Sequence, residues 1–285
     1  MGTILVTGSE GLIGKELIEL LELDKNNYII KADLKTGYDL TDYKTCLWLC
    51  ADVDEVYNLV GIKGSPKRTT ERPADFFAPT IQFNTNMLEA ARVKKVKKFL
   101  YVSSIAVEHP ETDVYPAWAK LTGEKQIETY IIQYPEGTKY SIVRPANIYG
   151  RYDNFNNEHA MVITSLVNKA LQSGDFLEVW GNGSAMRDFV NAKDVARAMI
   201  QCMKLMPQQP INICSGIGVS IKEVAEIIAR IVNKTVKYDI SKPTGAQSRV
   251  MRFDGNLIKW KPEIKIEQGI KEIFEVLNAD RKCAS

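Results

Sequence analysis

The stretch TILVTGSEGLIGKELIELLELDKNNYIIKAD at residues 3–33 decides the fold of this chain. Its first part, residues 3–7, is a short and mostly apolar run that predicts a buried strand. Residues 12–23 carry leucine and isoleucine at helical spacing, and residues 28–33 form a second apolar run. A strand, a helix and a second strand at this spacing predict a βαβ unit with parallel strands.

The turn between the first strand and the helix is TGSEGLIG, residues 7–14. Gly8 allows a tight turn, Gly11 lets a pyrophosphate approach the backbone, and Gly14 lets the helix pack closely on the strand. The free N–H groups at the start of the helix would face the anion. Asp33 ends the second strand nineteen residues after Gly14, where a carboxylate can accept both hydroxyls of a ribose. This context predicts a dinucleotide-binding (Rossmann) unit.

Asp33 also predicts which dinucleotide binds. A carboxylate at this position would repel a 2′-phosphate, so we expect NAD rather than NADP. Lys35 is a nearby cation that acts in the opposite direction.

The rest of the chain continues the alternation of apolar runs and helical patterns. We predict an α/β fold, with a doubly wound parallel sheet and a smaller α/β C-terminal lobe that binds substrate. Residues 1–150 would form the NAD-binding domain with a later contribution from about 187–215. Residues 151–285 would mainly form the substrate-binding lobe.

Composition excludes several classes of function. The formal net charge is +2 with acids and bases interspersed, so no nucleic-acid partner is expected. No apolar run is long enough for a bilayer span, so no membrane partner is expected. The five cysteines form no CxxC pair and the chain has two histidines, so no metal site is predicted. Reduced thiols and the absence of a signal peptide at the start favour a cytoplasmic location.

Further motifs give the chain a family resemblance. They include DEVYNLVG at 54–61, KFLYVSSIAV at 98–107, AWAKLTGEK at 117–125, RPANIYG at 144–150 and VWGNGSAMRDFVNAKDVA at 179–196. With the glycine turn, these motifs resemble the extended short-chain dehydrogenases/reductases of the nucleotide-sugar epimerase/dehydratase group. The segment YGRYDNFNNEHAMVI at 149–163 is most similar to the GDP-sugar branch. The predicted cofactor contacts are Gly8, Gly11, Leu12, Ile13, Gly14, Asp33, Asp39, Leu40, Leu59 and Lys120.

The resemblance implies that hydride moves between a sugar carbon, usually C4, and the nicotinamide. In that family a Tyr-x-x-x-Lys pair and a serine or threonine move the proton, and the lysine lowers the pKa of the tyrosine. Lys120 matches the lysine and Ser104 matches the serine, but Pro116 stands where the tyrosine belongs. Tyr115 is one residue too early. It could lie just outside the helix and swing inward as the base, which we favour, or it could be a surface residue.

Other positions narrow the reaction. The related dehydratases carry an acid pair after the serine or threonine, but this chain has Ile105 and Ala106 there. GDP-fucose synthases resemble the chain but carry cysteine and histidine at the positions of Ala106 and Met161. Once dehydration and epimerisation of the other ring carbons are excluded, simple redox chemistry at C4 is the reaction that we expect.

For substrate binding, the resemblance points to three further residues, namely Asn147, Arg187 and Arg249. An arginine can clamp a diphosphate through two parallel hydrogen bonds. The alternative for Arg187 is a structural salt bridge with Asp188 or Asp194.

Three functions follow as hypotheses. The leading one is NAD-dependent oxidation at C4 of a nucleotide sugar, a GDP-hexose or GDP-heptose, by a 4-dehydrogenase or 4-epimerase in surface-polysaccharide biosynthesis. The second is a nucleotide-4-keto-sugar reductase, and the third is a non-catalytic protein that binds NAD or a nucleotide sugar. The resemblance also implies a homodimer through the helices near 79–94 and 117–133.

Overall fold

The computed structural model describes residues 2–62, 66–111, 114–155, 160–242, 244 and 248–284, apart from the side chains of 66–68, 248, 249 and 280–284. Its larger part is a six-stranded sheet with the order β2-β1-β3-β4-β5-β9. All neighbouring strands in this sheet are parallel. The strands are β1 (Gly2–Thr7), β2 (Asn27–Ala32), β3 (Glu55–Asn58), β4 (Lys98–Val102), β5 (Lys139–Pro145) and β9 (Ile211–Ile213). The chain runs outward from β1 in both directions, so a ligand crevice is expected where the order reverses, at the carboxyl ends of β1 and β3.

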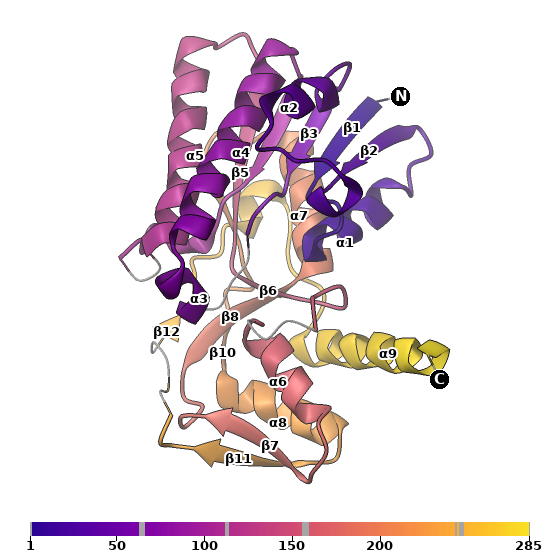
Figure 1. Cartoon of the computed structure of the whole chain (residues 1–285), viewed down its shortest axis with the longest axis vertical. Coiled ribbons are helices and arrows are strands. Elements are labelled where there is room, and N and C mark those ends of the chain that lie inside the picture. The colour runs from indigo at the N-terminus through magenta and orange to yellow at the C-terminus, as the bar shows by residue number, and fades with distance from the viewer. Residues whose placement is uncertain are drawn as a thin grey trace.

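Helices cover both faces of this sheet, as Figure 1 shows. The helices α1 (Leu12–Leu21) and α7 (Ala192–Leu205) lie on one face, where they pack on Ile4, Val6 and Val102. The helices α2 (Tyr43–Leu49), α4 (Ala74–Val93) and α5 (Val114–Gln133) lie on the other face, over Leu5 and Tyr101. Alternate residues of each strand thus serve opposite helix layers, because strand side chains alternate between the two faces of a sheet.

A smaller lobe lies below the sheet in Figure 1. In one of its sheets, β6 (Asn147–Tyr149), β10 (Gly218–Ser220) and β12 (Ser248–Arg249) all pair with β8 (Met186–Asn191). A second sheet joins β7 (Phe176–Trp180) to β11 (Thr235–Asp239). The lobe's core also takes side chains from the helices α6 (Val162–Ala170), α8 (Ile221–Ile231) and α9 (Ile266–Ala284).

Short helical elements complete the description: α3 (Pro66–Glu71) and the 3₁₀ turns η1 (Leu34–Thr36), η2 (Ile105–Glu108) and η3 (Gly255–Ile258). The doubly wound α/β fold predicted from the sequence is confirmed. The predicted start of the long helix near residue 79 was wrong, because α4 begins at Ala74 and contains Pro79 in its second turn. Pro79 is the sixth residue of α4 and lies beyond the four N–H groups that have no partner inside the helix, so it removes one hydrogen bond from the helix, the one to the carbonyl oxygen of Asp75.

Candidate active site

The glycine turn between β1 and α1 has the geometry that the sequence predicts. Gly8 has a φ of +69°, and a Cβ there would lie 3.2 Å from the backbone of Leu59. A Cβ on Gly14 would clash with the carbonyl oxygen of Gly8. Gly11 is the N-cap of α1, and no described side chain caps the helix there. The first N–H groups of α1 are therefore available to an anion.

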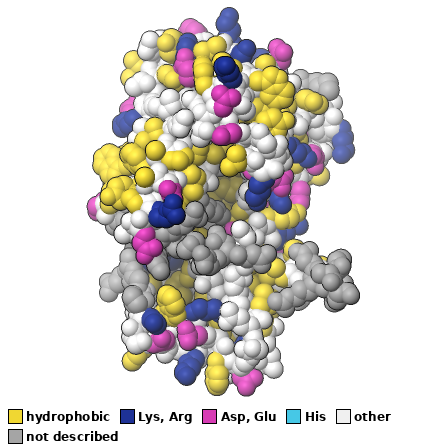
Figure 2. Space-filling view, in the orientation of Figure 1, with side chains coloured by type: hydrophobic (Ala, Val, Ile, Leu, Met, Phe, Trp, Pro, Cys, Tyr) yellow, Lys and Arg dark blue, Asp and Glu magenta, His cyan; other side chains and the backbone are white. Residues whose placement is uncertain are grey.

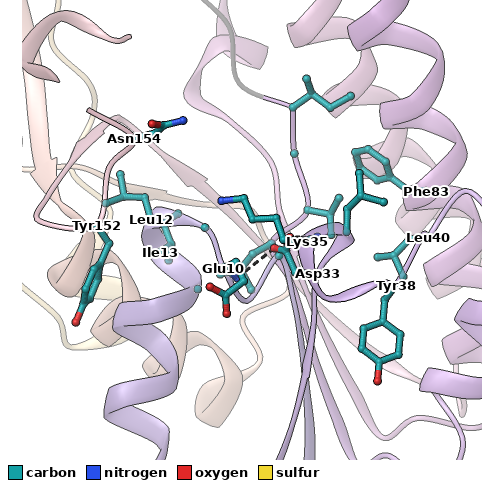
Figure 3. Close-up of a pocket in the computed structure, with 18 of the residues that line it drawn as sticks. Glu10, Leu12, Ile13, Asp33, Lys35, Tyr38, Leu40, Phe83, Tyr152 and Asn154 are labelled. Carbon is teal, nitrogen blue, oxygen red and sulfur yellow. Dashed lines mark hydrogen bonds between the residues drawn. The ribbon is translucent and has the colours of Figure 1, made fainter. Parts of the chain in front are cut away.

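A cleft of about 500 Å³ opens beside this turn. It is lined by the segments that follow β1, β2 and β3, and by residues 152–154 from the loop after β6. Figure 3 shows side chains from these segments pointing into the cleft. The predicted cofactor residues that line it are Gly8, Gly11, Leu12, Ile13, Gly14, Asp33, Asp39, Leu40 and Leu59.

Asp33 is held rigidly on the rim of the cleft. One carboxylate oxygen accepts a hydrogen bond from the N–H of Glu10 at 3.1 Å, and the other accepts from the N–H of Lys35 at 2.9 Å. Each carboxylate oxygen can accept a second bond, so hydroxyl groups of a ribose can still be bound. Figure 3 shows the side chains of Glu10, Asp33 and Lys35 together at this rim.

Asp39 and an aromatic pair lie farther along the same side. Asp39 accepts hydrogen bonds from the N–H and the hydroxyl of Thr41, at 2.9 and 2.7 Å. Tyr38 lines the cleft and stacks on Trp48, with ring centroids 6.0 Å apart and an interplanar angle of 12°. Sequence reasoning missed Tyr38, although an aromatic residue beside Asp39 could have suggested a wall for a flat base.

Lys120 is partly buried beside the cleft and is not among the described residues that line it. Its ammonium donates to the carbonyl oxygens of Val60 and Val102, at 3.2 and 2.8 Å, and Val60 itself lines the cleft. Burial lowers the pKa of Lys120 to about 8. Ser104 follows β4, caps η2 and accepts a hydrogen bond from the N–H of Ala106 at 3.2 Å. The Lys120 ammonium and Ser104 therefore lie near the carboxyl ends of β3 and β4, and neither residue is among the described residues that line the cleft.

Tyr115 lies in the first turn of α5, so the expectation that it sits just outside the helix was wrong. The helix begins at Val114, and a proline at the third helical position interrupts no internal hydrogen bond. Lys120 follows Tyr115 by five positions, which places the two residues about 140° apart around the helix axis. The Tyr115 side chain is 45% exposed, and it is not among the described residues that line the cleft.

Two of the predicted substrate residues lie on neighbouring strands of the smaller lobe. Arg187 is on β8 and Arg249 on β12, where their backbones stand opposite each other. The side chain of Arg249 lies outside the described part of the chain. Arg187 donates to the carbonyl oxygen of Met186 at 2.7 Å, and Asn147 donates to the carbonyl oxygen of Asp188 at 2.9 Å.

In the described part of the chain, Arg187 does not form the salt bridge with Asp188 or Asp194 that was considered as the alternative to substrate binding. Asp188 instead accepts hydrogen bonds from Ser215 and from the N–H of Gly216. Asp194 pairs with Arg197 at 2.7 Å. The two buried aspartates thus anchor neighbouring backbone segments and other side chains, which leaves the role of Arg187 to be tested.

Sequence reasoning missed an ion-pair cluster that ties the loop after β6 to α1. Arg151 donates to both carboxylate oxygens of Glu16, at 2.9 and 3.1 Å, and also pairs with Glu19 at 2.5 Å. Tyr152 donates to Glu19 as well and lines the cleft. Glu16 is only 2% exposed and faces inward at helical spacing from Leu12 and Ile13. In the sequence, an acid on the otherwise apolar face of the helix could have suggested that Glu16 has a buried partner.

Comparisons with known proteins agree with this geometry. The chain is 29% identical to the probable GDP-L-fucose synthase 1 of Oryza sativa subsp. japonica, over 96% of this chain and 91% of the relative. It is 27% identical to the GDP-L-fucose synthase of Escherichia coli strain K12, over 98% of each. Its fold matches MlghC, a GDP-mannoheptose C4 reductase from Campylobacter jejuni with NADP bound. The TM-score is 0.85 at 22% identity, over 97% of this chain and 98% of that structure.

A family model matches most of the sequence. Residues 4–214 fit the model described as the NAD dependent epimerase/dehydratase family, and this range contains the glycine turn, the cleft and Lys120. None of the helices in the described part of the chain combines the length and the apolar character needed to cross a membrane. The chain belongs to the NAD dependent epimerase/dehydratase family.

Proposed function

We propose that this protein is an NAD-dependent enzyme that oxidises C4 of a GDP-sugar, either releasing the 4-keto product or returning hydride to the opposite face as an epimerase. The observation that carries the proposal is the position of Lys120. Its partly buried ammonium donates to the carbonyl oxygen of Val60, a residue that also lines the cleft. When bound, the cofactor would supply the hydride acceptor, and Lys120 would hold its nicotinamide ribose. Ser104 would hydrogen-bond the sugar hydroxyl that loses its proton.

The rim of the cleft supports NAD as the cofactor. Asp33 places a carboxylate there, and Glu10 places a second one that pairs with Lys15 at 3.4 Å. Among the described residues that line the cleft, Lys35 is the one cation. The Asp33 carboxylate would repel a 2′-phosphate. The GDP-sugar class is supported by the relatives that cover nearly the whole chain, whose names are GDP-L-fucose synthases.

A reductase acting on a 4-keto nucleotide sugar is the second candidate. Lys35 favours it, since a lysine at the rim can contact the 2′-phosphate of NADPH, the usual reductant. The same Ser104 and Lys120 would then deliver a proton as hydride arrives.

One experiment distinguishes the two. The protein is incubated with NAD and GDP-hexoses or GDP-heptoses, and separately with NADPH or NADH and the 4-keto sugars. Products are followed by NMR and by absorbance of the reduced nicotinamide. We expect a C4-oxidised or C4-inverted sugar in the first set, and no 6-deoxy product, because Ile105 and Ala106 offer no acid or base. Turnover only with NADPH and a 4-keto sugar would replace the leading proposal by the reductase. Lys120→Met is the control for background chemistry.

We also propose that the protein is a homodimer through α4 and α5, which lie side by side on one face of the sheet (Figure 1). Val114, Trp118 and Ile132 share one side of α5 by helical spacing and are 43%, 49% and 76% exposed. Figure 2 shows apolar side chains gathered over the lower end of α5. Light scattering should give twice the chain mass, and Trp118→Glu with Ile132→Glu should give the monomer.

A further inference from the structure

A chain of buried polar side chains runs from β1 to Lys120. The hydroxyl of Thr7 donates to the Asn58 side chain at 2.7 Å, and Asn58 donates to the Asn84 side chain at 2.9 Å. Asn84 donates to the hydroxyl of Tyr101 at 3.3 Å, and that hydroxyl donates to the backbone carbonyl of Lys120 at 3.1 Å. The four residues that precede Lys120 in this series of hydrogen bonds are each at most 1% exposed. Buried hydrogen-bond chains are costly unless each member is satisfied, so this one fixes its members in place.

Tyr101 contacts Lys120 at two points. Its hydroxyl binds the backbone of the lysine, and its ring centroid lies 5.4 Å from the ammonium nitrogen. The space for the hydroxyl exists because residue 123 on α5 is a glycine, where a Cβ would clash with the Tyr101 oxygen. The tyrosine therefore contacts both the backbone and the ammonium of the lysine.

The lysine has few other groups to stabilise its charge. Its ammonium is held by the carbonyl oxygens of Val60 and Val102, and among the described residues no carboxylate pairs with it. The acids described on α5, α4 and η2 are bound to other side chains: Asp75 to Arg72, Glu89 to Arg92, Glu108 to Asn212, Glu124 to Arg144 and Glu128 to Lys125. The face of an aromatic ring attracts a cation, most strongly where water is excluded. We propose that Tyr101 is a positioning residue that keeps Lys120 charged and aligned behind the cofactor cleft.

The pH dependence of folding tests this without any cofactor. Burial lowers the pKa of Lys120 to about 8 in the folded protein, from 10.5 when exposed. Between these two values the unfolded chain binds the proton and the folded chain does not, so Lys120 adds stability as the pH rises through this window. The contribution is measured as the difference in unfolding free energy between the wild type and Lys120→Met at each pH.

Tyr101→Leu removes the ring and should make the charged lysine less favourable still. We expect the lower edge of the window to move down by about half a pH unit to one unit, the equivalent of a buried cation–π contact. In this background, the contribution of Lys120 is the difference in unfolding free energy between Tyr101→Leu and the double variant Tyr101→Leu with Lys120→Met. Phe99→Leu is the matched control, because Phe99 is equally buried on the same face of β4 and should leave the edge in place. An edge that does not move in Tyr101→Leu, or that moves equally in Phe99→Leu, overturns the proposal.

A binding measurement adds the functional consequence and rests on the proposed function. At pH 8, a fall of one unit in the pKa of Lys120 would reduce the protonated fraction roughly fivefold. Tyr101→Leu should then weaken dinucleotide binding by about that factor at pH 8 and little at pH 6.5. A loss that is equal at both pH values would mean that Tyr101 acts through packing alone. If neither NAD nor NADP binds the wild type, the proposed function fails, while the unfolding measurement still decides the role of Tyr101.

Discussion

At the scale of single residues, we expect Asp33 to decide which cofactor fits the cleft. Its carboxylate is fixed by two backbone N–H groups before any ligand arrives, so little ordering is needed on binding. We expect NAD to bind more tightly than NADP. Asp33→Ala should weaken NAD binding by roughly 10- to 100-fold, the worth of a hydrogen bond to a charged group, and should leave NADP binding unchanged or improved. Calorimetric titration measures both affinities. Asp175→Ala, an exposed carboxylate in the smaller lobe, is the control. Equal affinities for NAD and NADP in the wild type would contradict this assignment.

Tyr115 is the residue on which the sequence and the structure differ most. The helix places its phenol about 140° from Lys120, so we now expect Tyr115→Phe to reduce kcat less than about tenfold. Lys120→Met should reduce it far more, by about 10²-fold, because the nicotinamide ribose loses the ammonium proposed to hold it in place. Because the Tyr101 hydroxyl beside Lys120 is bound to a backbone carbonyl and Tyr115 lies elsewhere on the helix, we expect neither phenol to act as the base. Turnover should then be slow and should rise with pH as solvent hydroxide takes the sugar proton. The measurement is kcat across pH 6 to 10. A fall of 10² or more in Tyr115→Phe would instead show that the first turn of α5 opens when substrate binds.

At the scale of elements, glycine in the middle of α5 serves packing. Glycine to alanine inside a helix normally adds up to about 1 kcal/mol of stability. Gly123→Ala should do the reverse and cost about 1–3 kcal/mol, since the new Cβ would meet the fixed hydroxyl and ring edge of Tyr101. Chemical denaturation measures the change, with Thr129→Ala on the same helix as a control. Tyr101→Leu combined with Gly123→Ala should be more stable than the sum of the single changes predicts. Strict additivity would show that the two side chains do not compete for space.

The sequence predicts those parts of the structure that are encoded by patterns among neighbouring residues. The glycine turn, Asp33 and the alternation of strands and helices are local patterns, and the sheet, the cleft and its nine predicted contacts follow from them. The start of α4 and the helical position of Tyr115 were predicted wrongly, because a proline marks a helix start only by preference. The network from Thr7 to Lys120 joins residues 17 to 51 positions apart in successive bonds. Its members are ordinary polar residues in the sequence, and only the packing of β3, β4, α4 and α5 brings them together.

At the scale of the whole molecule, Arg151 links the two lobes across the cofactor cleft. The residue follows β6 of the smaller lobe, and its guanidinium holds Glu16 on α1 through two bonds. The next residues, Tyr152 to Asn154, form the far wall of the cleft. We therefore expect the position of this wall around a dinucleotide to depend on the ion pair. Glu16 is 2% exposed, so its charge has little water to solvate it if the arginine is removed.

Arg151→Met should therefore lower the free energy of unfolding by about 3 kcal/mol, the lower end for breaking a buried pair, because Arg151 itself is 28% exposed on its side chain. It should also weaken dinucleotide binding, since the loop that carries Tyr152 loses its anchor on α1.

The double variant Arg151→Met with Glu16→Met replaces the pair by apolar side chains of similar length. It should regain most of the stability, because no buried charge is left without a partner. It should not regain the binding, because the loop's directional anchor is still missing. Denaturation curves and dinucleotide titrations on the wild type, both single variants and the double variant separate these effects. A double variant no more stable than Arg151→Met would show that the cost came from lost packing of the loop, and equal binding in all four proteins would show that the cleft closes without this pair.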